Sequence, residues 1–245
     1  MTVSMQPVDR VEILTLQDNY IDILARDNSD IITRAMPLKG TEVRNSILAE
    51  HGFSAVITTI VDNSSRSMLF DFGFSEHGAA FNAEALGVDM KQVEMMALSH
   101  GHLDHVGGIE KLSGMIGKPG IPLVLHPEAF RNPRYMQVTE NFKIMFPPFT
   151  REKAEAARAE VVATAEPYSM LDGQVLFLSE IERTTAFEKG APSLRYEKDG
   201  VPMQDTFEDD TGLAFVVRDK GLVVLSGCAH SGIVNTVRHA RKVTG

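Results

Sequence analysis

The sequence has almost no cysteine: Cys228 is the only one among 245 residues. An internal disulfide is therefore excluded, and a reducing compartment is the simpler expectation. The sequence also lacks any run of ~18 apolar residues that could cross a membrane as a helix. Residues 1–10 lack the basic start and the apolar run of a secretion signal. We therefore expect a cytoplasmic protein without membrane attachment.

Positive charge is also scarce. Lys and Arg number 24 against 33 Asp and Glu, which gives a formal net charge of −9, and the basic residues do not cluster. This balance disfavours nonspecific binding to nucleic acid or to an anionic membrane. We expect a small-molecule substrate instead. The sequence does not indicate an oligomeric state.

Length and composition favour one folded unit. The chain is 43% hydrophobic and has no long polar tract, so it can bury a substantial core, and we predict a single domain over residues 1–245. Strand-like and helix-like segments follow one another, which favours an α/β fold. Residues 27–50 are expected to form an irregular loop. The predicted strands are 11–16, 54–61, 67–72, 93–98, 121–126, 175–178, 213–217 and 222–225, and the predicted helices are 79–86, 151–164 and 233–243.

The densest group of reactive side chains is the stretch Ser-His-Gly-His-Leu-Asp-His at positions 99–105. It places the imidazoles of His100, His102 and His105 and the carboxylate of Asp104 within six positions, between a predicted strand and a helix-like segment. Ligand sites of α/β sheets collect at such strand-to-helix turns. A lone histidine there would be read as a solvated turn residue or a hydrogen-bonded core residue. Four such residues so close together favour a ligand site.

Neutral imidazoles with a carboxylate are the usual ligands of Zn²⁺ or another first-row divalent ion. Residues two apart on a turn point to the same side, so His100 and His102 can share one ion, while Asp104 and His105 can face a second. A paired site activates a water and polarises the bond that it attacks. We therefore expect one or two divalent ions, with zinc as the first choice and iron or manganese as alternatives.

The motif resembles the signature of the metallo-β-lactamase superfamily. The resemblance rests on His-x-His-x-Asp-His at positions 100–105, on Gly107-Gly108 after it, and on the segment Met-Leu-Phe-Asp-Phe-Gly at 68–73, which is similar to the hairpin end that precedes the signature. The resemblance implies an α/β fold of the metallo-β-lactamase type, a four-layer αβ/βα sandwich over nearly the whole chain. It also implies a dinuclear metal site in the cleft between two sheets.

Four shorter segments point to one branch of this superfamily. They are Asp18-Asn19-Tyr20, His126-Pro127-x-Ala129-Phe130, Ser179-Glu180-Ile181-x-Arg183 and Gly227-Cys228-x-His230-x-Gly232-Ile233-x-Asn235. Together they resemble the branch labelled 7,8-dihydropterin-6-yl-methyl-4-(β-D-ribofuranosyl)aminobenzene 5′-phosphate synthase. This resemblance constrains the fold and the site better than the substrate.

The second half of the sequence departs from the superfamily pattern. Most members have a further metal-binding histidine where this chain has Glu208-Asp209-Asp210, so either a carboxylate substitutes or that ligand is absent. Most have a bridging aspartate where this chain has Cys228, which is either a thiolate ligand or a buried small hydrophobe. His230 lies at a strand-to-helix turn and is expected to bind metal, with hydrogen bonding at the start of the helix as the alternative.

Two further expectations concern the end of the chain and a phosphate group. The superfamily has one more strand, with a last metal-binding histidine, after the helix at 233–243. We therefore expect the fold to lack its last C-terminal strand, either because the chain is truncated or because this protein completes the site otherwise. Arg131 and Arg134 could hold a phosphate of the substrate, although such arginines are often solvated or salt-bridged.

Three functions fit these residues. The first is a metal-dependent hydrolase in which His100, His102, Asp104, His105 and His230 hold the metal, and Asp104 also orients the attacking water. Its target would be a phosphoester, an ester or a related bond of a small molecule. The second is a synthase that joins a pterin and a ribofuranosyl-aminobenzene phosphate. The third is a non-catalytic binding module with a degenerate metal site.

Overall fold

Two β-sheets form the centre of this computed structural model, which describes residues 2–245. Within that range, the larger sheet has six strands: it is antiparallel from β1 to β5 and parallel from β5 to β10. In spatial order its strands are β1 (Arg10–Gln17), β4 (Ser54–Val61), β5 (Ser64–Phe70), β6 (Val93–Ala97), β7 (Ile121–Leu125) and β10 (Ala159–Ala163). The second sheet is antiparallel and contains β11 (Tyr168–Met170), β12 (Val175–Phe177), β15 (Gly212–Val217) and β16 (Gly221–Ser226).

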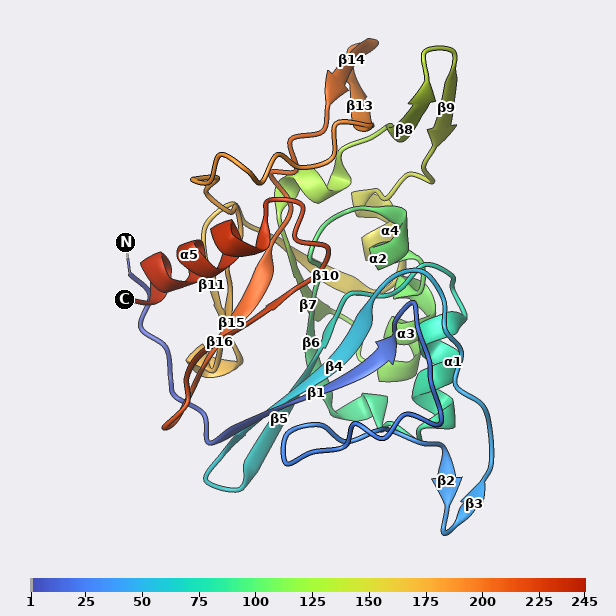
Figure 1. The fold of residues 1–245 in the computed structure, drawn as a ribbon, viewed down its shortest axis with the longest axis vertical. Helices are drawn as coiled ribbons and strands as arrows, with labels where there is room; N and C mark the ends of the chain where they lie inside the picture. The colour runs from blue at the N-terminus through green and yellow to red at the C-terminus, as the bar shows by residue number, and fades with distance from the viewer. Residues whose placement is uncertain (1) are drawn as a thin grey trace.

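Helices cover the outer faces of both sheets (Figure 1). The larger sheet is covered by α1 (Gly78–Ala85), α3 (Ile109–Ile116) and α4 (Arg151–Ala156), and the second sheet by α5 (Ile233–Thr244). The short helix α2 (Leu103–Val106) lies beyond the end of β6. The 3₁₀ turns are η1 (Met90–Gln92), η2 (Pro127–Phe130) and η3 (Leu171–Gly173), and residues 18–53 form a long loop that contains only the small hairpin β2 (Leu38–Lys39) and β3 (Glu42–Val43).

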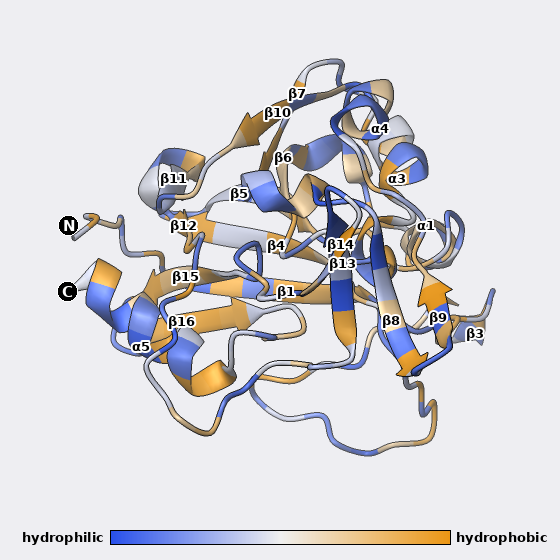
Figure 2. Cartoon of the chain, turned by 90° about the horizontal axis from the view of Figure 1, so that it is seen from above, coloured by the Kyte–Doolittle hydropathy of each residue, from blue (hydrophilic) through white to orange (hydrophobic). Residues whose placement is uncertain are grey.

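Three buried clusters separate four layers. Neighbouring residues of one strand fall into different clusters, as side-chain alternation along a strand requires: Leu69 packs under the helices, whereas Phe70 packs between the sheets. In the second sheet, Phe177 faces the first sheet and Leu176 faces α5. Figure 2 shows that hydrophobic residues make up much of β1, β15 and β16. The four-layer arrangement therefore follows from strands that are apolar on both faces.

A third sheet projects from these layers as an arm (Figure 1). It is antiparallel and contains β14 (Val201–Gln204), β13 (Leu194–Lys198), β8 (Arg134–Thr139) and β9 (Phe142–Met145), in that order. The arm was not predicted. Its strands begin or end beside the histidine motif, so it supplies residues to the candidate site.

The predicted strands are confirmed to within a few residues, and so is the last helix. The predicted helix at 151–164 is wrong in its second half, because α4 ends at Ala156 and residues 159–163 form β10. Arg158, with a φ of 60°, breaks the helix, and Val161 and Val162 then pair in parallel register with β7. Pairing with the sheet outweighs the helical propensity of the Ala- and Glu-rich sequence.

The end of the chain adds no further strand to the described fold, which closes with α5. The prediction of one domain over residues 1–245 and the prediction of a missing last strand both stay predictions. Among the helices of residues 2–245, none has the length and apolar character needed to cross a membrane.

Candidate metal centre

The histidine motif forms the loop between β6 and α2. His100 lies in the loop with no exposed surface, and His102 directly precedes the first turn of α2, which carries Asp104 and His105. All four side chains are buried. A loop that buries four ionisable side chains needs partners that fix it, since burial of charge is costly without them.

Asp71, at the end of β5, supplies much of that support. Its carboxylate accepts hydrogen bonds from the Ser99 backbone N–H (2.6 Å), from the Ser99 hydroxyl (2.7 Å) and from His105 Nδ1 (2.6 Å). Burial alone would lower the pKa of His105, but Asp71 and Asp104 outweigh it and raise that pKa well above its usual value. Asp71 thus fixes both the start of the loop and the orientation of His105.

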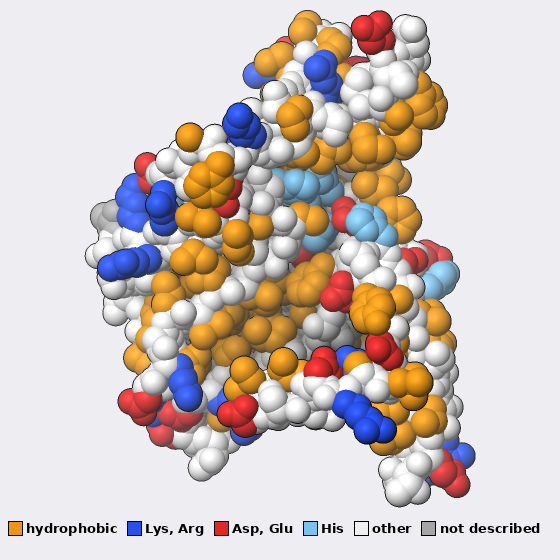
Figure 3. Space-filling model, in the orientation of Figure 1, with side chains coloured by type: hydrophobic (Ala, Val, Ile, Leu, Met, Phe, Trp, Pro, Cys, Tyr) orange, Lys and Arg blue, Asp and Glu red, His pale blue; other side chains and the backbone are white. Residues whose placement is uncertain are grey.

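The structure brings His230 to the motif, although 125 residues separate His230 from His105. The His230 ring centroid lies 4.8 Å from that of His100 and 5.0 Å from that of His102, and the His100 and His102 centroids are 4.6 Å apart. Figure 3 shows histidine side chains, in pale blue, gathered in a hollow of the surface. The sequence could place His230 at a turn, but only the fold places it in this group.

These imidazoles have the properties of metal ligands. The Nε2 atoms of His100, His102 and His230 are buried without a hydrogen-bond partner. Burial, followed by repulsion from neighbouring histidines, lowers the pKa of His100 well below its usual value and that of His230 to about 4. Both rings are therefore neutral at pH 7 and can donate a lone pair to a cation. A divalent ion would satisfy polar atoms that the protein leaves without a partner.

Two groups of side chains bring their ligand atoms within 4.8 Å of one another. The groups are His100 with Asp104 and His105, and His100 with Cys228 and His230. Burial would raise the pKa of Asp104, but its contacts with His105 prevail and lower it to about 2, so the carboxylate is ionised. His100 belongs to both groups. The arrangement can hold one ion, or two that share this histidine.

Cys228 is exposed, and its Sγ lies 3.1 Å from His105 Nε2. The alternative of a buried small hydrophobe is therefore wrong. Sulfur is a ligand that suits zinc and iron. The metal-ligand role of Cys228, like that of the five residues predicted to bind metal, stays a prediction.

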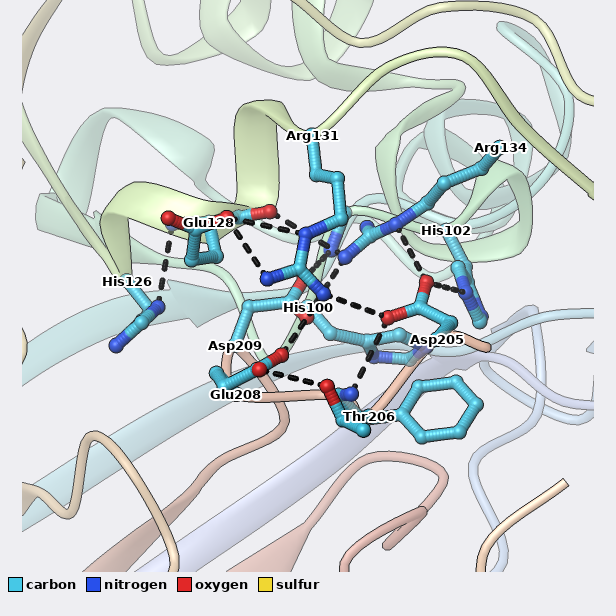
Figure 4. Close-up of polar contacts among 12 residues, drawn as sticks. His100, His102, His126, Glu128, Arg131, Arg134, Asp205, Thr206, Glu208 and Asp209 are labelled. Atoms are coloured by element: carbon cyan, nitrogen blue, oxygen red, sulfur yellow. Dashed lines mark hydrogen bonds and ion pairs between the residues drawn. The ribbon is translucent and has the colours of Figure 1, made fainter. Parts of the chain in front are cut away.

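The carboxylates of residues 208–210 bind other groups of the protein, and Figure 4 shows those of Glu208 and Asp209. Glu208 pairs with Arg131 (2.8 Å), and Asp209 pairs with Arg134 (2.8 Å) and accepts the Gly101 N–H (2.9 Å). Asp210 accepts the Ser231 backbone N–H (2.7 Å), and burial raises its pKa to about 6. The other carboxylate oxygen of Asp210, Oδ1, is buried without a hydrogen-bond partner. The possibility that a carboxylate here substitutes for the usual histidine therefore stays a prediction.

Arg131 and Arg134 are also engaged. Arg131 contacts Glu128, Asp205 and Glu208, and Arg134 contacts Asp205 and Asp209. Both side chains are less than 10% exposed. The alternative that these arginines are salt-bridged is therefore confirmed, and a role in holding a phosphate stays a prediction.

Three residues beside the centre were not predicted from the sequence. His51 lies with its Nε2 3.2 Å from the Asp104 carboxylate, although no role was assigned to it. Phe207 stacks on His230 with the rings 4.3 Å apart and nearly parallel. Asp205 lies beside His102 at the base of the arm. None of the three belongs to a motif of the sequence, and their contacts with the histidines are made only in the fold.

Comparisons with known proteins relate this chain to one superfamily. The family model described as the metallo-beta-lactamase superfamily matches residues 51–241. The chain is 31% identical over 227 residues to a 7,8-dihydropterin-6-methyl-4-(beta-D-ribofuranosyl)-aminobenzene-5′-phosphate synthase of Methanocaldococcus jannaschii, with 89% of this chain and 74% of that protein covered. An uncharacterized protein of the same archaeon is 28% identical, with 80% and 69% covered.

A solved structure of similar fold is described as a metal-dependent hydrolase of the beta-lactamase superfamily. It superposes with a TM-score of 0.65 over 95% of this chain and 72% of that one, at 22% sequence identity. At this identity the match shows the fold alone. The expected arrangement of strands and helices is thereby confirmed.

Proposed function

Because the chain belongs to the metallo-beta-lactamase superfamily, we propose that it is a metal-dependent hydrolase of a small molecule. The bond would be a phosphoester, an ester or a related bond. One observation carries the proposal: two groups of ligand atoms share His100, and the Nε2 atoms of His100 and of two imidazoles near it, His102 and His230, are buried without a partner.

The side chains proposed to hold the metal are His100, His102, Asp104, His105 and His230, with Cys228 as a sixth. Zinc is the first choice because it accepts imidazole, thiolate and carboxylate ligands, and iron is the next, with manganese behind it. A bound divalent ion would polarise the substrate and lower the pKa of a water to about 7.

The protein's own residues set where that chemistry takes place. Asp104 stays ionised at neutral pH, so its carboxylate can accept a hydrogen bond from the attacking water and orient it. His51 is largely exposed and contacts Asp104 at 3.2 Å, so it marks the open side of the site. Phe146 and Phe207 flank His102 edge-on, with centroids 5.7 and 5.6 Å away, and form apolar walls that restrict water.

Metal content and hydrolysis test the proposal together. After reconstitution with zinc, iron or manganese, the protein should retain metal through gel filtration and hydrolyse at least one substrate of a panel of phosphodiesters, phosphomonoesters and lactones. His100→Ala should lose both properties, because both ligand groups contain His100. His77→Ala is the matched control, since His77 is exposed and contacts only Glu76 among the ion pairs of residues 2–245. A protein that retains no metal would contradict the proposal.

A synthase reaction is the second candidate, favoured by the 31% identity to the archaeal protein that carries a synthase name. It would use the same centre with a pterin and a ribofuranosyl-aminobenzene phosphate. Incubation with both substrates and product analysis by mass spectrometry would separate it from hydrolysis. If metal binds and neither reaction occurs, a non-catalytic binding module becomes the better description.

A further inference from the structure

A buried aromatic residue with an unfavourable backbone conformation lies against the candidate metal centre. Phe207 is 2% exposed and has a φ of 57°. This left-handed region suits glycine, and a bulky residue persists there only where the surrounding structure holds it. Among the residues that the structure describes, Phe207 is the only aromatic one with a positive φ. Strain of this kind gathers at functional sites, so the contacts of the Phe207 ring need an explanation.

The ring of Phe207 contacts two of the proposed metal ligands. It stacks on His230 with the centroids 4.3 Å apart and the planes 5° from parallel. It also meets the ring of His102 edge-on, with the centroids 5.6 Å apart and an angle of 80°. Because stacking covers one face of the His230 ring, it opposes rotation of that ring. Phe207 therefore restrains the plane in which His230 presents its buried, unpartnered Nε2.

Hydrogen bonds on both sides of the stack keep Phe207 in this conformation. The Phe207 backbone N–H donates to Asp205 Oδ1 (3.2 Å). Arg183 Nη2 donates to the carbonyls of Thr206 (3.0 Å) and His230 (3.2 Å). One guanidinium thus joins the residue before Phe207 to the residue on which Phe207 stacks.

The two turns that carry the stacked rings are joined a second time through Asp210. Its backbone N–H donates to the Phe207 carbonyl (3.1 Å), and its carboxylate accepts the Ser231 N–H (2.7 Å). Ala229, directly before His230, also has a positive φ, of 52°. Left-handed residues therefore occur in both turns, and the contacts between the turns hold one ring against the other.

We propose that Phe207 is a positioning residue for His230: its strained backbone places the ring against this histidine and fixes the plane in which His230 meets the metal. The inference rests on the proposed metal centre. Phe207 directly precedes residues 208–210, where most superfamily members have a further metal-binding histidine, so this segment reaches the centre through an aromatic ring. Residues that orient metal ligands without binding the ion typically change metal affinity about 10- to 100-fold when they are replaced.

The first test compares two buried phenylalanines. Phe207→Leu keeps a buried apolar side chain but removes the ring, and we expect zinc affinity, measured by competition with a chromophoric chelator, to fall about 10- to 100-fold. Phe215→Leu is the matched control, because Phe215 is equally buried but packs between the sheets. Urea unfolding should show that both variants lose stability, whereas Phe215→Leu should bind zinc as the wild type does. Equal zinc affinities for Phe207→Leu and the wild type would overturn the proposal.

The second test needs no variant at the positioning residue. NMR of the zinc-loaded wild type, labelled at histidine and phenylalanine and with His230 assigned through His230→Gln, reports whether the two rings stay stacked when the metal is bound. We expect nuclear Overhauser contacts between the ring protons of Phe207 and His230. Their absence would overturn the inference while leaving the metal centre intact, and it decides the matter even if Phe207→Leu does not fold. A protein that binds no zinc would overturn the proposed function, and the inference with it.

Discussion

The two halves of the candidate metal centre are built in different ways. In the first half, the loop at 99–105 presents four potential ligands in one stretch, and Asp71 alone receives three hydrogen bonds that fix it. In the second half, the potential ligands His230 and Cys228 stand between β16 and α5, and the carboxylates around them bind arginines and backbone N–H groups.

The two halves also differ in how many contacts between side chains support each of them. Asp71 supplies three of the hydrogen bonds to the loop, and Asp209 supplies one through the Gly101 N–H, so the loss of Asp71 removes most of this support. In the second half, Arg134 contacts both Asp205 and Asp209, and Arg131 contacts three carboxylates. Loss of one member of that network leaves the others paired. The first half should therefore be fragile to mutation and the second half tolerant.

The largest expected effect is that of Asp71→Ala. Removal of this carboxylate leaves two Ser99 donors and His105 buried without their partner, and breaking a buried pair typically costs about 3–5 kcal/mol. Urea unfolding of the metal-free protein should show this loss in the free energy of unfolding. Glu197→Ala, which removes an exposed ion pair with Lys143, should cost less than about 1 kcal/mol. Similar losses for the two variants would contradict the special role of Asp71.

Asp209→Ala should have a smaller effect, although Asp209 is as buried as Asp71. Arg134 keeps Asp205 as a partner, so the main loss is the hydrogen bond to the Gly101 N–H. Leaving one such donor unsatisfied costs about 1–3 kcal/mol. The same unfolding experiment measures it. If Asp209→Ala destabilises the protein more than Asp71→Ala, the prediction that the first half is more sensitive to mutation than the second half is wrong.

The same contrast explains what the sequence could and could not predict. The motif at 99–105 was predictable because its four potential ligands lie within six positions of the chain, between a predicted strand and a helix-like segment. The strands were predictable because their apolar residues pack between layers. The arm was not, since residues 134–145 and 194–204 are short, polar in part and separated by other elements. Asp205 could not be identified because its partners, His102 and Arg134, are distant in sequence and meet only through the arm.

Cys228→Ser tests whether the second half contributes a ligand. With cobalt in place of the native ion, a thiolate ligand gives an intense charge-transfer absorption in the near ultraviolet, which a serine hydroxyl does not. Since Cys228 is the only cysteine, that band can have no other origin in the protein. We expect the band in the wild type, its loss in the variant, and metal affinity weaker by about 10-fold, or 1.4 kcal/mol. A wild type that binds cobalt without the band would remove Cys228 from the centre.

At neutral pH, His230→Gln should change the stability of the metal-free protein least among these variants. Its effect on that stability should appear only as the pH falls. The pKa of His230 is about 4 in the folded protein, against roughly 6.5 in an unfolded chain. Between these values the unfolded state binds the proton and the folded state does not, so the stability of the metal-free protein falls as the pH drops from about 6.5 to 4. His100, whose pKa is also lowered, contributes to the same fall, so the prediction concerns the difference between variant and wild type. His230→Gln should lose less stability over this range, whereas the exposed control His77→Gln should follow the wild type. If the free energy of unfolding of His230→Gln depends on pH as that of the wild type does, burial among the other histidines does not hold His230 neutral. The second half would then lack the ligand that links it to the first half.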